Sequence, residues 1–154
     1  MTDLVIYYTR TSNTKIAAET IAQEKNAELV EVRDKTNRSG SIRYIIGALD
    51  ALMGNKTNIL YQEKNLKEYD TVYIGTPVWA GKPAPAIKQF IKENDFGGVN
   101  VVSFCTMGSN GDKSTIESMN YLIQTRGGKI KRSFAMAVKN RDIRELALKA
   151  IKED

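Results

Sequence analysis

The segment Leu4-Val5-Ile6-Tyr7-Tyr8-Thr9-Arg10-Thr11-Ser12-Asn13-Thr14 contains the change of pattern that decides the fold. It begins with an uninterrupted apolar run of β-branched and aromatic residues, which is typical of a strand buried on both faces. A cluster of Ser, Thr and Asn residues follows, and such residues favour the start of a helix. Helical spacing then places apolar side chains at Ile16, Ala17, Ile21 and Ala22. A buried strand that leads directly into a helix is typical of parallel α/β folds.

The same alternation of strands and helices continues to the end of the chain. Further strands are predicted at residues 29–32, 72–74, 99–104 and 129–138, and Gly75 and Pro77 are expected to end the third strand. Apolar residues at helical spacing predict helices over residues 42–53, 83–91, 116–123 and 143–151. The second and fifth strands are the more polar ones and are expected at the sheet edges. The pattern predicts one α/β domain over residues 1–154, a three-layer sandwich with a five-stranded parallel sheet in the order 2-1-3-4-5.

Composition narrows the function classes. The 154 residues are 42% hydrophobic and 27% charged, which is ordinary for a soluble globular domain. The chain has no histidine, so catalytic triads built on an imidazole are excluded. A single cysteine, Cys105, excludes a disulfide framework and a four-cysteine metal site.

Charge and targeting signals bear on partners and location. No signal peptide or membrane-spanning run is apparent, so we expect a cytoplasmic protein. The net charge of +5 suggests an acidic partner, although the basic residues could simply be solvated helix faces. No basic run is interleaved with aromatic residues, so nucleic acid is not expected as a partner.

Open parallel sheets bind ligands beyond the carboxyl ends of their strands, where the strand order reverses. The loops to inspect therefore follow Tyr8, Ile74 and Phe104. In the first loop, residues 9–14 combine four hydroxyl side chains and an amide with a helix start, whose free N–H groups attract anions. This combination suits a phosphate group, and the alternative is a capping cluster without a ligand.

Other ligands of similar folds fail on particular residues. The first loop lacks both the Gly-x-Gly-x-x-Gly spacing of dinucleotide sites and the Gly-Lys-Ser/Thr of nucleotide P-loops. A phosphorelay receiver would need acidic residues where Thr9 and Gly75 stand. A cysteine phosphatase loop would need arginine at position 111, which is glycine.

The second and third loops suit a flat ligand. Trp79 is the only tryptophan, and it could stack on an aromatic ring or fold back into the core. Residues 105–112 form a small and polar loop, which suits hydrogen bonds along the edge of a heterocycle. We expect Cys105 to be a small buried residue rather than a nucleophile.

At these positions the sequence resembles the flavodoxin family over its whole length. The resemblance rests on Thr9-x-Thr11-Ser12-Asn13-Thr14, on Gly75-Thr76-Pro77-Val78-Trp79-Ala80-Gly81 and on Phe104-Cys105-Thr106-Met107-Gly108. It implies a flavodoxin-like sandwich that binds FMN without a covalent bond. The first segment would hold the phosphate, Trp79 would stack on the isoalloxazine, and residues 106–108 would line the pyrimidine edge. The implied site consists of Thr9, Arg10, Thr11, Ser12, Asn13, Thr14, Thr76, Pro77, Val78, Trp79, Ala80, Gly81, Thr106, Met107 and Gly108.

The resemblance also implies a function. The leading hypothesis is a carrier, a monomer or weak dimer, that moves electrons between redox enzymes through the quinone, semiquinone and hydroquinone states of its flavin. Its partners would be redox proteins such as an acidic ferredoxin or a reductase. One alternative is an FMN-dependent oxidoreductase that acts on quinones with NAD(P)H, or on a porphyrin precursor. Another is a flavin-free interaction domain.

One position departs from the family pattern, because Ser12 stands where the family has glycine. We expect Ser12 to adopt a backbone conformation that any residue tolerates, since a positive φ would be strained.

Overall fold

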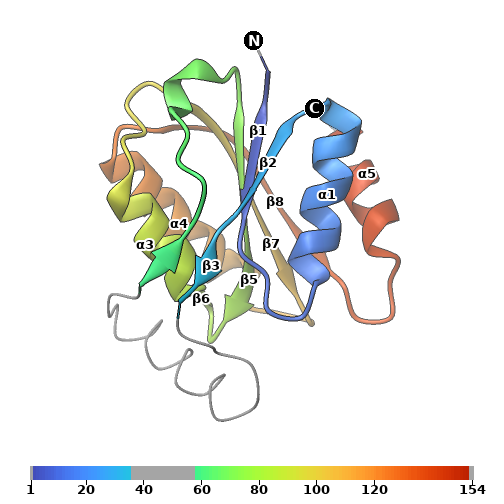
Figure 1. Cartoon of the computed structure of the whole chain (residues 1–154). Helices are drawn as coiled ribbons and strands as arrows, with labels where there is room; N and C mark the ends of the chain where they lie inside the picture. Colours follow the sequence, from blue (N-terminus) through green and yellow to red (C-terminus); the bar gives the residue numbers. More distant parts are fainter. Residues whose placement is uncertain (1, 36–57, 153–154) are drawn as a thin grey trace.

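The computed structural model describes residues 2–35 and 58–152, and its centre is a parallel sheet (Figure 1). The strands run in the order β2 (Glu28–Glu31), β1 (Leu4–Tyr7), β5 (Val72–Trp79), β7 (Asn100–Met107) and β8 (Lys129–Ala137). All four pairings between these neighbours are parallel. The predicted order is confirmed, and both strands predicted at the edges are edge strands.

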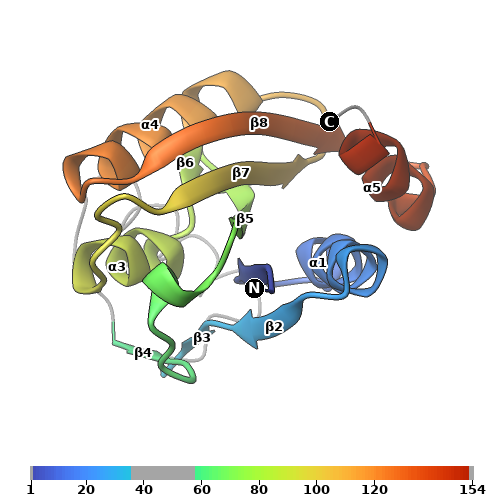
Figure 2. The same ribbon diagram turned by 90° about the horizontal axis from the view of Figure 1, so that it is seen from above.

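Helices cover both faces of this sheet. The helices α1 (Asn13–Lys25) and α5 (Ile143–Lys152) lie on one face, and α3 (Pro85–Glu93) and α4 (Asp112–Thr125) lie on the other (Figure 2). Four of the predicted helices are therefore confirmed, whereas the one predicted over residues 42–53 lies outside the described residues. None of the described helices has the length and apolar character needed to cross a membrane.

The alternation of side chains along β1 explains why both layers form. Leu4 and Ile6 belong to the core beneath α3 and α4, whereas Val5 and Tyr7 belong to the core beneath α1 and α5. All four side chains are buried, so β1 contributes to both cores at once. The uninterrupted apolar run at the start of the sequence therefore supplies buried side chains to both faces of the sheet.

The strand β5 is longer than predicted, because it passes through Gly75 and Pro77 to Trp79. A Cβ atom at Gly75 would overlap the ring of Phe104 on β7, so this glycine accommodates a neighbour and does not end the strand. The carbonyl of Gly75 accepts the last β1 hydrogen bond, from the N–H of Tyr8. The backbone nitrogen of Pro77, two residues later, also points toward β1. Because β1 has ended at that level, the missing N–H of proline costs no hydrogen bond of the sheet.

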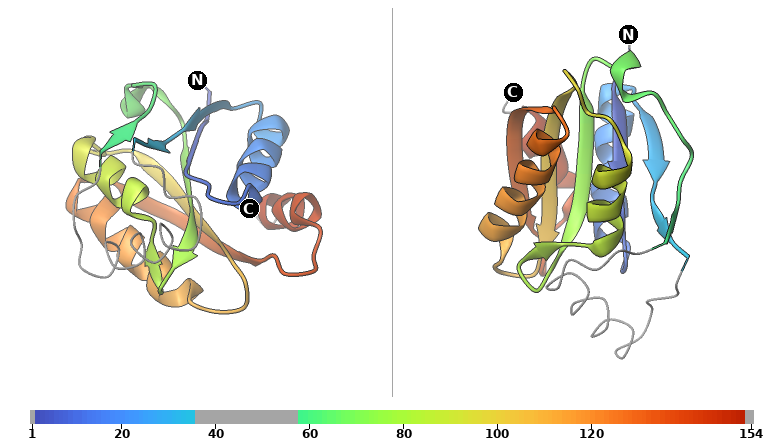
Figure 3. Two further views of the ribbon diagram at one scale, coloured as in Figure 1. Left: turned by 60° about the horizontal axis from the view of Figure 1, so that its bottom comes forward. Right: turned by 90° about the vertical axis from the view of Figure 1, so that its left-hand side faces the viewer.

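Short elements that the sequence did not indicate complete the fold. The strand β6 (Lys82–Pro83) pairs antiparallel with β5 around a two-residue turn, in which Ala80 and Gly81 have φ values of 51° and 71°. The strands β3 (Arg33–Asp34) and β4 (Ile59–Leu60) form a separate two-stranded sheet, and a short 3-10 helix, η1 (Leu66–Glu68), follows. Figure 3 shows the main sheet between its two helical layers.

Candidate functional site

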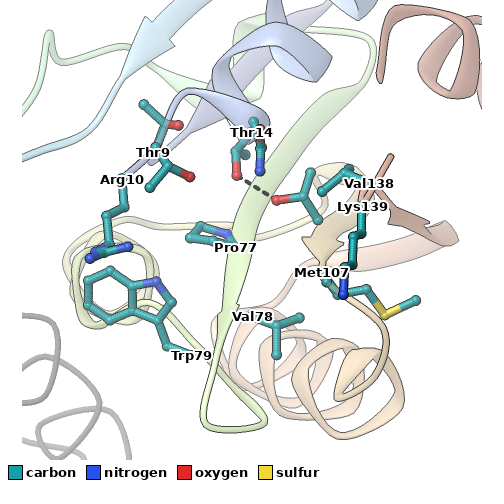
Figure 4. A pocket seen from close by; sticks show the side chains of 13 residues that line it. Thr9, Arg10, Thr14, Pro77, Val78, Trp79, Met107, Val138 and Lys139 are labelled. Carbon is teal, nitrogen blue, oxygen red and sulfur yellow. Dashed lines mark hydrogen bonds between the residues drawn. The ribbon is translucent and has the colours of Figure 1, made fainter. Parts of the chain in front are cut away.

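A cavity of about 360 Å³ opens at the carboxyl ends of β1, β5 and β7 (Figure 4). This is where the strand order reverses, and its volume lies within the range of small-molecule sites. The walls come from the loop into α1, the end of β5, the end of β7 and the loop after β8. The lining residues are Thr9, Arg10, Thr11, Asn13, Thr14, Pro77, Val78, Trp79, Thr106, Met107, Gly108, Val138 and Lys139.

Most of the site residues expected from the sequence line this cavity, and Ser12, Thr76, Ala80 and Gly81 do not. The Thr76 hydroxyl is fully buried, donates to the Pro77 carbonyl and accepts from the N–H of Ala84. It therefore joins β5 to the start of α3. Ala80 and Gly81 form the turn behind Trp79.

Sequence reasoning missed Val138 and Lys139, which follow β8. The N–H of Val138 donates to the carbonyl of Met107 at 2.9 Å, so this loop adjoins the end of β7. Parallel strands end at one edge of a sheet, and that rule could have directed attention to the residues after the fifth strand.

The start of α1 corrects the expectation for Ser12. Its φ of 74° and ψ of −5° lie in the left-handed region, where an L residue is strained. Its side chain makes no capping hydrogen bond to the helix. The hydroxyl of Thr9 accepts a hydrogen bond from the N–H of Lys15, which is long, with 3.4 Å between nitrogen and oxygen. The first turn of α1 thus has no cap from Ser12 and only one long hydrogen bond from Thr9, which favours the anion-site interpretation over the capping interpretation.

Two threonines join the first loop to the third loop across the floor of the cavity. The Thr14 and Thr106 hydroxyl oxygens lie 2.9 Å apart, and both residues are buried (Figure 4). Thr14 lies in the first turn of α1, and Thr106 lies near the end of β7. The hydrogen bond links segments that are 92 residues apart in the chain.

Trp79 belongs both to the cavity wall and to the core. The residue is only 2% exposed, and its ring meets Tyr8 edge-on at a centroid distance of 5.7 Å. In this structure the ring is packed as the core interpretation predicts, and Trp79 also belongs to the residues that line the cavity. In Figure 4 Arg10 and Trp79 appear on one side of the cavity, and Met107 and Lys139 appear on the other.

The charged side chains of the described lining are basic. The lining contains Arg10 and Lys139, and the described part of the chain contributes no acidic side chain to it. Cys105 lies outside the lining and is fully buried. Burial, with a smaller effect of Asp112, raises the pKa of its thiol to about 12. Cys105 is therefore a protonated core residue, as expected from the sequence.

Comparisons with known proteins agree with this geometry. The sequence profile of the Flavodoxin family matches residues 2–136. No curated protein sequence matches the chain. A flavoprotein from Lactobacillus acidophilus, solved in complex with FMN, is 29% identical, with a TM-score of 0.77 over 87% of this chain and 92% of that one.

The apo form of the flavoprotein from Lactobacillus acidophilus is 28% identical, with a TM-score of 0.69 over 88% of this chain and 91% of that one. Oxidised flavodoxin 2 from Bacillus cereus is 15% identical, with a TM-score of 0.60 over 100% of both chains, and at that identity it supports the fold alone.

Proposed function

Because this chain belongs to the flavodoxin family, we propose that it is an electron carrier that holds FMN in the cavity at the carboxyl edge of its sheet. The observation that carries the proposal is the pairing of two features on one cavity. The first turn of α1, where Ser12 provides no side-chain cap, suits a phosphate group, and the lining of the same cavity contains the tryptophan.

The chemistry of the lining fits the two ends of FMN. A phosphate dianion needs hydrogen-bond donors and positive potential, which the α1 start, the hydroxyls of residues 9–14 and Arg10 supply. A flat ring needs an aromatic surface and a close-lying backbone, which Trp79 and residues 107 and 108 supply. The Lactobacillus acidophilus flavoprotein was solved in complex with FMN, and its likeness to this chain supports FMN as the ligand.

The residues of the lining favour a carrier over an enzyme. When bound, FMN supplies one- and two-electron transfer. No side chain of the described lining is a carboxylate, an imidazole or a thiol, so the protein groups bind and orient and do not relay protons near neutral pH. The cationic surroundings and the net charge of +5 support an acidic redox protein as the partner.

A fluorescence titration tests the cofactor. Trp79 is the only tryptophan, so tryptophan emission reports on this wall of the cavity alone. We expect FMN to quench it with a saturable 1:1 curve and riboflavin to bind more weakly. Trp79→Phe, which removes the emission, is followed by flavin fluorescence as the matched control. An absence of saturable FMN binding would overturn the proposal.

A second experiment tests the role. We expect the chemically reduced FMN-loaded protein to pass electrons to an acidic ferredoxin in a stopped-flow experiment. We also expect no steady-state turnover of a quinone with NADPH unless a reductase is added. Sustained turnover by the protein alone would instead identify an FMN-dependent oxidoreductase.

A further inference from the structure

We propose that Thr106 is a positioning residue that orients the Thr14 hydroxyl toward the phosphate of the ligand and so makes the site select phosphorylated over unphosphorylated flavin. The inference rests on the proposed function, because it assigns the α1 end of the cavity to the phosphate group. Thr106 would act through Thr14 and would not touch the phosphate itself.

The strand geometry explains why this threonine reaches α1. Val102 and Phe104 belong to the core beneath α1 and α5, and Thr106 follows them on the same face of β7. Its hydroxyl therefore lies beneath the start of α1, where it meets the Thr14 hydroxyl at 2.9 Å. Thr14 and Thr106 are 1% and 3% exposed, so water competes little for this hydrogen bond.

The donors and acceptors in this pair determine its direction. Each hydroxyl has one proton to donate and two lone pairs to accept, and the bond between the two oxygens uses one of the two protons. A phosphate dianion at the start of α1 can only accept. With phosphate bound, the Thr14 proton points to the phosphate, and Thr106 must therefore be the donor within the pair. A donor to Thr14 polarises the Thr14 hydroxyl and strengthens the bond that Thr14 donates.

This arrangement affects one end of the ligand only. Riboflavin has the ring and the ribityl chain of FMN but no phosphate, so its affinity should not depend on the direction of the Thr14 proton. The dissociation constant of riboflavin divided by that of FMN, the selectivity ratio, therefore isolates the effect of Thr106.

The test measures the dissociation constants of FMN and riboflavin for the full chain and four variants. In Thr106→Val, which keeps the β-branched shape, we expect FMN to bind about two- to tenfold more weakly and riboflavin to bind within twofold of the parent. Thr106→Ser, which keeps the hydroxyl, should restore the parent ratio. Thr14→Val should lower the selectivity ratio below that of Thr106→Val. The double variant should have the same selectivity ratio as Thr14→Val.

Each contrary result has a distinct meaning. Equal weakening of FMN and riboflavin in Thr106→Val would show a merely structural role and overturn the inference. A further loss of the ratio in the double variant would show that Thr106 acts independently of Thr14, which also overturns it. If the parent protein binds FMN no more tightly than riboflavin, the inference of a phosphate subsite is overturned, whereas flavin binding itself still stands. Binding of neither would overturn the proposed function itself.

Discussion

The Ser114 hydroxyl donates a hydrogen bond of 2.7 Å to the carbonyl oxygen of Gly81 and so ties the first turn of α4 to the turn that follows Trp79. The same region is closely packed, because a Cβ atom at Gly111 would lie 2.7 Å from a methyl group of Val78. Gly111 also has a φ of 93°, which glycine adopts without strain. The start of α4 therefore holds the wall that contains Trp79.

Loss of this hydrogen bond should loosen that wall. In Ser114→Ala we expect FMN to bind about two- to tenfold more weakly, the usual net value of one hydrogen bond, because the turn behind Trp79 must then be ordered on binding. Ser118→Ala is the matched control, since it makes the same exchange one turn further along α4. Fluorescence titration measures both variants, and equal affinities for the two would show that the Ser114 bond does not support the site.

The strain at Ser12 predicts an unusual effect of glycine. A left-handed L residue costs about 1–2 kcal/mol, whereas glycine loses about 0.5–1 kcal/mol through its freer unfolded chain. Ser12→Gly should therefore raise the free energy of unfolding, by up to about 1 kcal/mol, although glycine usually destabilises a protein.

Because the backbone conformation is kept, FMN affinity in Ser12→Gly should change less than tenfold. Ser12→Ala removes the hydroxyl but keeps the strain, so it separates the two effects in the same denaturant titrations. A lower stability of Ser12→Gly would show that the strain is absent in solution.

Sequence patterns predicted the sheet order and the helical layers because both depend on apolar periodicity, which β1 displays directly. They failed at β5, where Gly75 and Pro77 were expected to end the strand. Glycine and proline end a strand only where the sheet requires a side chain or a backbone N–H at their position. At these positions the Phe104 ring fills the space of a side chain, and the end of β1 removes the need for an N–H. The place of Lys139 at the cavity follows from the sheet topology, because the parallel strands share one carboxyl edge, and no local pattern around Lys139 encodes it.

Cys105 should make stability depend on pH in the alkaline range. Burial raises the pKa of its thiol from 9.0 to about 12 in the folded protein. The folded state thus retains the proton where the unfolded chain has lost it. Its contribution is fully present below about pH 9 and is lost as the pH rises toward 12.

Denaturant titrations of the parent and Cys105→Ala between pH 8 and about pH 11 isolate this effect, because the tyrosines titrate in both proteins. We expect the parent to lose stability more steeply than Cys105→Ala. Parallel curves would show that the folded thiol titrates like that of an unfolded chain.

Lys139 is an exposed cation at the cavity, so its effect on an anionic ligand should be small and sensitive to salt. We expect Lys139→Gln to weaken FMN binding by about two- to fivefold at low ionic strength, on the scale of an exposed ion pair, and less at high ionic strength. Lys129→Gln, at the other end of β8, is the matched control. Equal effects of the two variants would attribute the change to net charge alone.

The net charge of +5 leads to a prediction about partner binding. Electron transfer to an acidic ferredoxin should slow as salt is added, because the Debye length falls from ~10 Å at 0.1 M to ~3 Å at 1 M. The basic residues expected to steer the partner are Arg10, Lys82 and Lys113. Lys82 directly follows the turn behind Trp79, and Lys113 lies in the first turn of α4.

Two charge variants locate the effect in a stopped-flow experiment. Lys82→Gln should lower the association rate at low salt and leave it unchanged at 1 M salt, because at high salt the field of this side chain no longer reaches the approaching partner. Lys149→Gln makes the same charge change on α5, on the far face of the sheet, and should have the smaller effect. A rate that stays constant or rises with salt would show that the partner docks through apolar contacts, since burial of apolar surface does not weaken as charges are screened.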